Sequence, residues 1–429
     1  MANNRKRDLL FFIENEVQFE SLRPLLVYIK KNKLASFDIL IPSGGSLEAV
    51  NLKDIYEGGA KIAKDNNFEV IRCTDGIIAP GLVKNTKYQV LLAAYMYDWY
   101  YQNLDIKYRI MFPYASYYFN KPNWTIKQFI DQDYLADALL SHAVGTKPVT
   151  DIFTKTYIVP SLKLMDYKPN KKASKKPVLF FAPSYNEIDF AKKFLGKIAS
   201  IRKKYTVIVR GHHRVVYSDN SCISAQLYDQ ADKVYDMSNS SIVDALEVAD
   251  VVLSDNSAVI FDAIYCGVPV ALFCEDPDSL SYGDIHTAQA KLVSSGDILW
   301  TNTSDKIIEI IDATLDKSML ARQEVMRQKF FPIERQEPVQ QWLDVLNIYI
   351  HDKLPEEYYF AKKYWIERFG KQAVELHMTR HKLGEVNNLI NQLNTNIELE
   401  KNPGVKTATK RLYKAWLRKF RRGIKNDAY

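Results

Sequence analysis

Residues 249–276, ADVVLSDNSAVIFDAIYCGVPVALFCED, constrain the fold more than any other stretch of the chain. Two short apolar runs, 251–253 and 270–273, flank a predicted helix over 258–266 that ends at Gly-Val-Pro. A buried strand, a helix and a second buried strand make up the βαβ unit of a parallel sheet. This stretch therefore predicts an α/β protein.

A polar turn of Ser254, Asp255, Asn256 and Ser257 separates the first of these strands from the helix. In doubly wound sheets ligands bind at this position, because free backbone N–H groups and the positive end of the helix meet there. Serine and asparagine suit the turn both as helix caps and as donors to an anion. Asp262, on the helix, is a candidate acceptor for ribose hydroxyls. A capped helix with a solvated Asp262 is the alternative interpretation.

A second polar turn, residues 210–214 with the sequence RGHHR, follows the predicted strand TVIV. The guanidinium of Arg210 can bind phosphate oxygens through two N–H groups, and His212 or His213 can donate a hydrogen bond or a proton to a departing phosphate. The carboxyl ends of parallel strands share one edge of a sheet, so we expect this turn to converge with residues 254–257. A basic surface turn is the alternative.

The rest of the chain extends this α/β pattern. Strands are predicted at 8–13, 37–41, 68–73, 88–95, 108–112 and 178–182, and helices at 21–31, 52–66, 189–203, 304–316, 323–330 and 338–351. The expected domains are an N-terminal Rossmann-like acceptor domain (1–150), an exposed linker with seven lysines (151–176), a nucleotide-donor-binding Rossmann-like domain (177–300), a helical region (301–400) and a basic amphipathic tail (401–429).

Three pieces within residues 177–280 resemble the CDP-glycerol glycerophosphotransferase family, the teichoic-acid primases and polymerases with a GT-B fold. They are VLFFAPSYNE, VIVRGHH and ADVVLSDNSAVIFDAIYCGVPVALF, and the last is the most specific. The resemblance implies two Rossmann-like domains facing a cleft, with a helical C-terminal extension. It also implies a transferase that moves glycerol phosphate, or a related polyol phosphate, from a CDP-activated donor to a hydroxyl of a cell-envelope glycan or lipid-linked acceptor.

The resemblance also implies roles for individual residues. His212 and Arg210 would act on the diphosphate or the leaving group, and Asp262 would hold the ribose. The remaining expected donor-binding residues are Ser184, His213, Ser254, Asp255, Asn256 and Ser257. Each well-placed donor to the leaving phosphate contributes roughly 3–4 kcal/mol to transition-state stabilisation. Asn256 stands where the family usually has Tyr, and His213 where it often has Pro or an apolar residue.

The N-terminal domain departs from the family pattern. Members carry a His-Gly-Thr-Pro-Leu-Lys segment that supplies the proposed base for the acceptor hydroxyl, whereas the nearest counterpart by order, residues 111–117 (MFPYASY), has no histidine. Either a carboxylate such as Glu14 or Glu16 replaces that base, with Glu14 as our catalytic candidate, or a different group is transferred. A GT-B glycosyltransferase that uses a UDP- or CMP-sugar, a related sugar-nucleotide epimerase and a non-catalytic GT-B-like partner in envelope polysaccharide synthesis are the alternatives.

The C-terminal tail carries most of the charge. Residues 401–429 hold ten Lys or Arg and one Asp, a net +9, so residues 1–400 sum to −2 in a chain of net charge +7. Apolar residues recur every four positions from Ala408 to Ile424. A cationic amphipathic helix of this kind suits an anionic membrane surface. The residues expected to bind it are Lys410, Arg411, Lys414, Trp416, Arg418, Phe420, Arg421 and Arg422. A tail packed on its own protein is the alternative.

Composition excludes several other classes of protein. The near-neutral body argues against a nucleic-acid-binding groove. No signal peptide and no run of about 18 apolar residues is present, and the four cysteines lack metal-ligand spacing, as in a reduced cytosolic protein. No Asp-x-Asp motif appears at a strand end, so we expect no catalytic metal and no permanently bound cofactor, only the nucleotide-diphosphate donor as substrate. The expected location is cytoplasmic, peripheral at the inner face of the plasma membrane.

Overall fold

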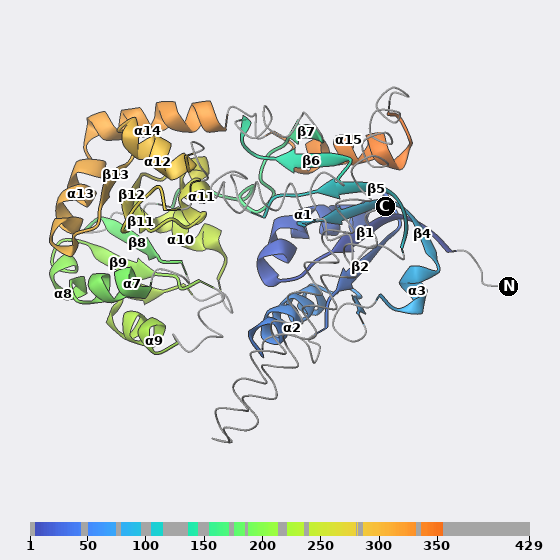
Figure 1. The fold of residues 1–429 in the computed structure, drawn as a ribbon, viewed down its shortest axis with the longest axis horizontal. Coiled ribbons are helices and arrows are strands. Elements are labelled where there is room, and N and C mark those ends of the chain that lie inside the picture. Colours follow the sequence, from blue (N-terminus) through green and yellow to red (C-terminus); the bar gives the residue numbers. More distant parts are fainter. Residues whose placement is uncertain are drawn as a thin grey trace, which may run out of the picture. The chain divides into compact units, whose positions relative to one another are not determined.

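The chain builds two parallel β-sheets, each with helices packed on both faces (Figure 1). The first has the strand order β3-β2-β1-β4-β5-β6-β7 and the second the order β10-β9-β8-β11-β12-β13. Counted from its own first strand, the second sheet therefore runs 3-2-1-4-5-6, which is the order of a Rossmann sheet. The first sheet follows the same order and has one further strand at its edge. The α/β class predicted from the sequence is confirmed.

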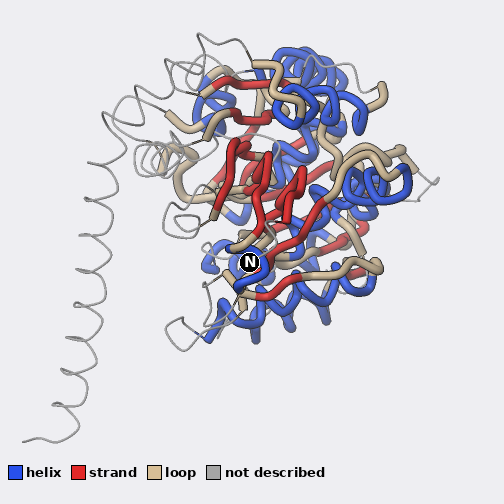
Figure 2. The backbone as a smooth tube through the Cα atoms, turned by 90° about the vertical axis from the view of Figure 1, so that its right-hand side faces the viewer, coloured by secondary structure: helices blue, strands red, loops and turns tan. Residues whose placement is uncertain are grey.

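This computed structural model describes residues 5–43, 50–73, 79–95, 104–114, 136–144, 154–170, 176–184, 188–212, 221–235, 240–279, 281, 286–331 and 336–354. They belong to the first of two units of the chain, Met1–Tyr364, and the second unit is Trp365–Tyr429. Figure 2 distinguishes the strands from the helices that flank them. Within the described ranges no helix is long and apolar enough to span a bilayer.

The first sheet and its helices match most of the predicted pattern. The strands are β1 (Arg5–Phe12), β2 (Phe37–Ile41), β3 (Ile71–Arg72), β4 (Thr86–Ala93), β5 (Asp105–Met111), β6 (Ala138–Ser141) and β7 (Lys155–Ile158), and the helices are α1 (Glu16–Asn32), α2 (Val50–Asp65) and α3 (Gly81–Lys84). Helix α1 begins five residues before the predicted start at residue 21, because the Asn15 side chain caps it by accepting a hydrogen bond from the Gln18 backbone N–H.

The second sheet matches the predicted strands at 178–182, 206–209, 251–253 and 270–273. Its strands are β8 (Val178–Ala182), β9 (Thr206–Val209), β10 (Lys233–Val234), β11 (Val251–Ser254), β12 (Val270–Phe273) and β13 (Leu299–Thr301). Its helices are α7 (Ile188–Leu195), α8 (Ile198–Ile201), α9 (Ser221–Gln230), α10 (Ile242–Val248), α11 (Val259–Cys266), α12 (Ala288–Ser294), η4 (Ser304–Lys306), α13 (Ile307–Thr314) and α14 (Lys317–Phe330). The single helix predicted over 189–203 is divided at Gly196, a poor helix former.

Strand β7 lies within residues 151–176, the segment expected from its lysines and prolines to be an exposed linker. β7 pairs with β6 at the edge of the first sheet, with Ser141 opposite Ile158. The side chain of Thr156 in β7 is buried, and so are Leu162 and Leu164 beyond the strand. The chain therefore stays packed against the protein as it leaves the first sheet. The predicted domain limits themselves stay predictions.

Helix α15 (Pro338–Ile350) packs against the first sheet, although it follows the last strand of the second. The Trp342 side chain is 1% exposed, and its Nε1–H donates to the carbonyl oxygen of Pro160 at 2.8 Å. Tyr349 packs edge-on against Tyr108 of β5, with ring centroids 5.3 Å apart. The chain thus returns to its first half, and Trp342 joins this returning helix to the segment that leaves the sheet.

We expect Trp342→Phe to lower the free energy of unfolding by about 1–3 kcal/mol, because it leaves the buried Pro160 carbonyl without its donor. The matched control is Trp300→Phe, the same chemical change at a side chain that is 37% exposed. The control should stay within about 0.5 kcal/mol of wild type. Thermal unfolding of both variants is the measurement. Equal changes in unfolding temperature would contradict the stabilising role assigned to the Trp342–Pro160 hydrogen bond.

Candidate active site

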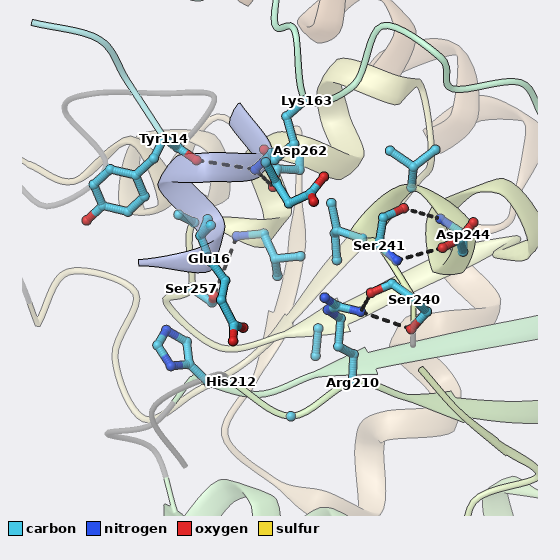
Figure 3. A pocket seen from close by; sticks show the side chains of 18 of the residues that line it. Glu16, Tyr114, Lys163, Arg210, His212, Ser240, Ser241, Asp244, Ser257 and Asp262 are labelled. Atoms are coloured by element: carbon cyan, nitrogen blue, oxygen red, sulfur yellow. Dashed lines mark hydrogen bonds and ion pairs between the residues drawn. The ribbon is translucent and has the colours of Figure 1, made fainter. Parts of the chain in front are cut away.

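A pocket of about 560 Å³ lies beyond the carboxyl ends of strands from both sheets (Figure 3). From the first sheet it is lined by Glu16, which follows β1, and by Tyr114, which follows β5. From the second it is lined by Pro183, which follows β8, and by Ser257, which follows β11. This volume is in the range of about 300–1,000 Å³ that small-molecule sites occupy. The pocket is therefore the candidate active site.

The turn after β11 is held in place by its own side chains. Ser254 Oγ donates to the carbonyl oxygen of Ala182 at 2.5 Å, and the Ser184 backbone N–H donates to Asp255 Oδ2 at 2.7 Å. These two bonds join the end of β11 to the end of β8. Asn256 Nδ2 donates to the Asp276 carbonyl oxygen at 2.9 Å. Of the four turn residues expected to bind phosphate, only Ser257 lines the pocket.

The turn after β9 brings Arg210 and His212 to the same pocket. Arg210 Nη1 donates to the Ser240 carbonyl oxygen at 2.9 Å and to Ser240 Oγ at 3.3 Å, which fixes the guanidinium beside the pocket. A Cβ at Gly211, between them, would lie 2.4 Å from Tyr228 Oη and would displace that side chain. Figure 3 shows His212 and Arg210 on one side of the pocket, below Ser257. The convergence expected from the two strand ends is present.

Asp262 lines the pocket from α11 and is paired with a residue that the sequence analysis did not single out. Lys163 Nζ donates to Asp262 Oδ2 at 2.6 Å and to the Tyr114 carbonyl oxygen at 3.3 Å. The two side chains are only 12% and 8% exposed. Lys163 stands in SLKLM, between Leu162 and Leu164, and such flanking by apolar residues is the one signal in the sequence that it is buried.

The two carboxylates considered as the acceptor-side base lie in different places. Glu14 Oε2 accepts a hydrogen bond from Gln18 Nε2 at 3.0 Å, and Glu14 does not line the pocket. Glu16, in the first turn of α1, does line it, and Figure 3 shows its carboxylate directed toward His212. Gly58 of α2 makes room for this carboxylate, since a Cβ there would lie 2.2 Å from Glu16 Oε1.

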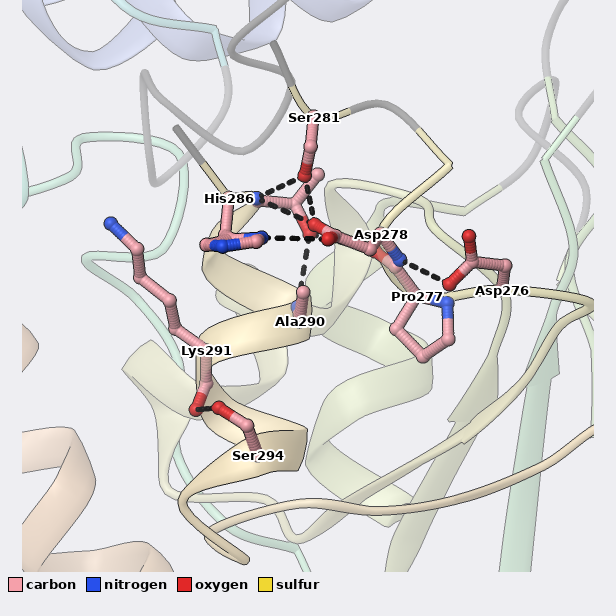
Figure 4. A network of polar contacts seen from close by, with 9 residues as sticks. Asp276, Pro277, Asp278, Ser281, His286, Ala290, Lys291 and Ser294 are labelled. Carbon is pink, nitrogen blue, oxygen red and sulfur yellow. Dashed lines mark hydrogen bonds and ion pairs between the residues drawn. The ribbon is translucent and has the colours of Figure 1, made fainter. Parts of the chain in front are cut away.

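His286, which lies just before α12, does not line the pocket. Figure 4 shows it with Ser281 around Asp278. His286 Nδ1 lies 2.6 Å from Asp278 Oδ2, and Ser281 Oγ donates to Asp278 Oδ1. Partial burial raises the pKa of Asp278, but the bonds from Ser281, His286 and the Thr287 backbone outweigh it and the net pKa is lowered. Across the described ranges, no group of three or more His, Cys, Asp or Glu side chains is arranged to hold a metal ion.

The predicted site residues thus divide into three groups. Arg210, His212, Ser257 and Asp262 line the pocket. The residues that lie close to the pocket without lining it are Glu14, Ser184, Ser254, Asp255 and Asn256. His213 and the eight tail residues between 410 and 422 lie outside the described residues.

His142 is buried next to the Lys163–Asp262 pair. Its side chain is 4% exposed, and its ring lies 6.2 Å from that of Trp342. Burial lowers the pKa of His142 to about 4; the bond to the Val159 carbonyl oxygen and the Asp262 charge raise it, and the Lys163 charge lowers it further. The ring is therefore neutral at pH 7. Its Nδ1 carries the proton, because the partner 2.9 Å away is a carbonyl oxygen that can only accept.

A family model described as CDP-glycerol:poly(glycerophosphate) glycerophosphotransferase matches residues 117–341, just over half of the 429 residues. The match includes every pocket residue contributed by the second sheet, as well as Lys163 and Asp166. None of the curated protein sequences matches the chain.

Solved structures share the fold. A protein from Listeria monocytogenes described as a UDP-N-acetylglucosamine 2-epimerase superposes with a TM-score of 0.55 at 11% identity, over 82% of this chain and 98% of its own. A histidine-to-alanine variant of the wall teichoic acid polymerase TagF gives 0.51 at 12% identity, over 81% and 90%. The UDP complex of MnaA from S. aureus gives 0.51 at 8% identity, over 81% and 97%. These likenesses confirm the predicted GT-B fold, with two Rossmann-like sheets.

We expect acidification to destabilise wild type more than His142→Asn. Between pH 6.5 and 4 the unfolded chain binds a proton at this position and the folded protein does not, so stability is lost as the pH falls. By pH 4.5 wild type should lose about 2–3 kcal/mol more than the variant, whose amide keeps a donor for the carbonyl without titrating.

Unfolding temperatures measured from pH 7.5 to 4.5 provide the test. His351→Asn, at an exposed histidine, is the control and should follow the wild-type profile. Parallel profiles for wild type and His142→Asn would show that His142 does not carry this pH dependence.

Proposed function

The chain belongs to the CDP-glycerol:poly(glycerophosphate) glycerophosphotransferase family, and from this membership we propose that it transfers glycerol phosphate, or a related polyol phosphate, from a CDP-activated donor to a hydroxyl group of a cell-envelope glycan or lipid-linked acceptor. The chain is an enzyme of the glycerophosphotransferase type. The observation that carries the finer assignment is that Arg210, His212, Ser257 and Asp262, from two separate strand ends, line one pocket with Glu16 of the first sheet.

The proposed donor lies along the second sheet. Asp262 accepts hydrogen bonds from the ribose, and Ser257 lies with Arg210 and His212 beside the two phosphates. Arginine is suited to this role because its planar guanidinium binds two phosphate oxygens at once. The charge that develops on the departing CMP is stabilised by donors that are already in place, so little rearrangement is needed during the reaction.

In the proposed reaction an oxygen of the acceptor hydroxyl attacks the phosphorus that carries the glycerol. The bond from this phosphorus to the oxygen of CMP breaks, CMP leaves with the electron pair, and a phosphodiester forms. The hydroxyl proton passes to a base on the acceptor side. We assign that role to Glu16, since it lines the pocket from the first sheet, whereas Glu14 is bonded to Gln18 outside it.

Teichoic-acid synthesis is the process that we propose for this reaction. The family description names poly(glycerophosphate) as the acceptor polymer, and TagF, which shares the fold, is a wall teichoic acid polymerase. Such acceptors are anchored in or on the cell envelope. An enzyme acting on them gains from a membrane-binding element, and this is the role that we propose for the basic tail 401–429, with the enzyme peripheral at the inner face of the plasma membrane.

His212→Ala and Glu16→Gln are each expected to slow CMP release from CDP-glycerol by about 10²–10⁴-fold, with membranes as the source of acceptor. His212→Ala removes a donor to the leaving phosphate, and Glu16→Gln removes the proton acceptor. CMP binding, measured by calorimetry, should persist in Glu16→Gln because that residue lies on the acceptor side.

Glu14→Gln separates the two carboxylates and should retain far more activity than Glu16→Gln. Binding of CDP-glycerol, CDP-ribitol, UDP-sugars and CMP-sugars to wild type, measured by thermal shift, identifies the donor. A shift with UDP-sugars alone would contradict the glycerophosphotransferase assignment and favour sugar chemistry. No shift with any nucleotide would favour a non-catalytic partner.

Removal of the tail is expected to abolish binding to anionic vesicles while leaving CMP binding intact. Each cation near an anionic surface contributes about 1 kcal/mol, and residues 403–429 hold nine Lys or Arg. Co-sedimentation of full-length protein and of a 1–402 truncation with phosphatidylglycerol vesicles is the measurement, and phosphatidylcholine vesicles are the control. Equal binding of the two proteins to the anionic vesicles would remove this role from the tail.

A further inference from the structure

The ion pair between Lys163 and Asp262 lies in the wall of the candidate active site (Figure 3). It joins two elements that are 99 residues apart in the chain. Lys163 comes from the segment that leaves the first sheet after β7, and Asp262 comes from α11 of the second sheet. Both side chains are largely buried, at 12% and 8% exposed.

Stability does not account for a lysine at this position. A buried ion pair contributes little net free energy of folding, because removing both charges from water offsets their attraction, and apolar residues of similar size often stabilise as well. The neighbouring Leu162 and Leu164 are buried apolar residues in the same short segment. A charged residue in the wall of a ligand pocket therefore points to a role in the pocket.

The surroundings hold Lys163 in a fixed place relative to α11. Two residues earlier, the Ser161 backbone N–H donates to Tyr265 Oη at 3.1 Å. One residue before that, the Pro160 carbonyl accepts from the indole of Trp342. Tyr265 and Asp262 are three residues apart on α11 and therefore share one face of the helix. The segment and the helix are thus joined by two bonds in register, and the ammonium group meets the carboxylate at a defined point.

This contact determines how the carboxylate faces a ligand. A carboxylate has about four lone-pair directions, and a charge-assisted bond from Lys163 to Oδ2 sets the orientation of the group while leaving it able to accept further hydrogen bonds. An oriented carboxylate at this depth is suited to accept two hydrogen bonds from a vicinal diol.

We propose that Lys163 is a positioning residue that fixes the Asp262 carboxylate for the 2′- and 3′-hydroxyls of the donor's ribose and so makes the site selective for ribonucleotides over 2′-deoxyribonucleotides. The inference rests on the proposed function, in which a nucleotide occupies this pocket with its ribose at Asp262. It goes beyond that function in two ways: it assigns Lys163 as the residue that orients the Asp262 carboxylate, and it assigns ribonucleotides as the class of nucleotide that the site selects.

Calorimetric titration of the full-length protein with CMP and with 2′-deoxy-CMP tests the proposal. Wild type should bind CMP roughly tenfold to a hundredfold more tightly, because the deoxy analogue leaves a charged acceptor without its donor. Lys163→Met should bring this ratio close to one, mainly by weakening CMP binding. Lys163→Arg, which keeps the cation, should restore part of the preference.

Two further variants separate positioning from folding. Lys204→Met removes a lysine that is also 2.6 Å from an aspartate, Asp312, but on the surface, and it should keep the wild-type ratio. The double variant Lys163→Met with Asp262→Asn removes both charges, so it folds without a buried unpaired carboxylate, and it should also show a ratio close to one.

A folded Lys163→Met that keeps the wild-type preference for CMP overturns this inference and leaves the proposed function standing. The same holds if wild type binds both nucleotides equally well. If wild type binds neither nucleotide, the proposed function itself fails, and the inference fails with it.

Discussion

The reversal of strand order at β8 and β11 is the constraint on which the site depends. Neighbouring strands there send their connections to opposite faces of the sheet, so a crevice opens between the two strand ends. Ser254 and Asp255 bridge that crevice through Ala182 and the Ser184 N–H, and this holds the start of α11 in place. Ser254 and Asp255, which were expected to bind phosphate, therefore hold the turn together by hydrogen bonds within the protein. Ser257, which follows them, lines the pocket.

The sequence predicted most of the fold because the signals are local. The short apolar runs VLFFA and VVL lie between turn residues, and each forms a buried strand. Gly267 ends α11 in the left-handed conformation, at φ 73°, as the Gly-Val-Pro stop indicated. The sequence did not predict β7, because the burial of β7 depends on its pairing with β6. A lysine-rich composition gives no sign of that pairing. The two-residue strand β10 was not predicted either, and it exists through pairing with the longer strand β9.

The site was predictable to the extent that it follows from strand ends. The rule that ligands bind at the carboxyl ends of parallel strands led to Arg210, His212 and Ser257, all of which line the pocket. The rule does not identify Lys163, because Lys163 meets its partner Asp262 only when the two halves of the chain pack together. Glu14 was the catalytic candidate named from the sequence, whereas Glu16 is the carboxylate that lines the pocket, because Asn15 caps α1 and Glu16 lies in its first turn.

The absence of a histidine in residues 111–117 changes the chemistry less than it first suggests. A carboxylate can accept the proton of an attacking hydroxyl at phosphorus, and protein kinases use an aspartate for this step. Glu16 lies in the first turn of α1, where the positive end of the helix dipole favours an ionised carboxylate. For the proposed base, the position of the carboxylate relative to the phosphorus is the requirement, and the absence of a side chain at Gly58 leaves room for the Glu16 carboxylate.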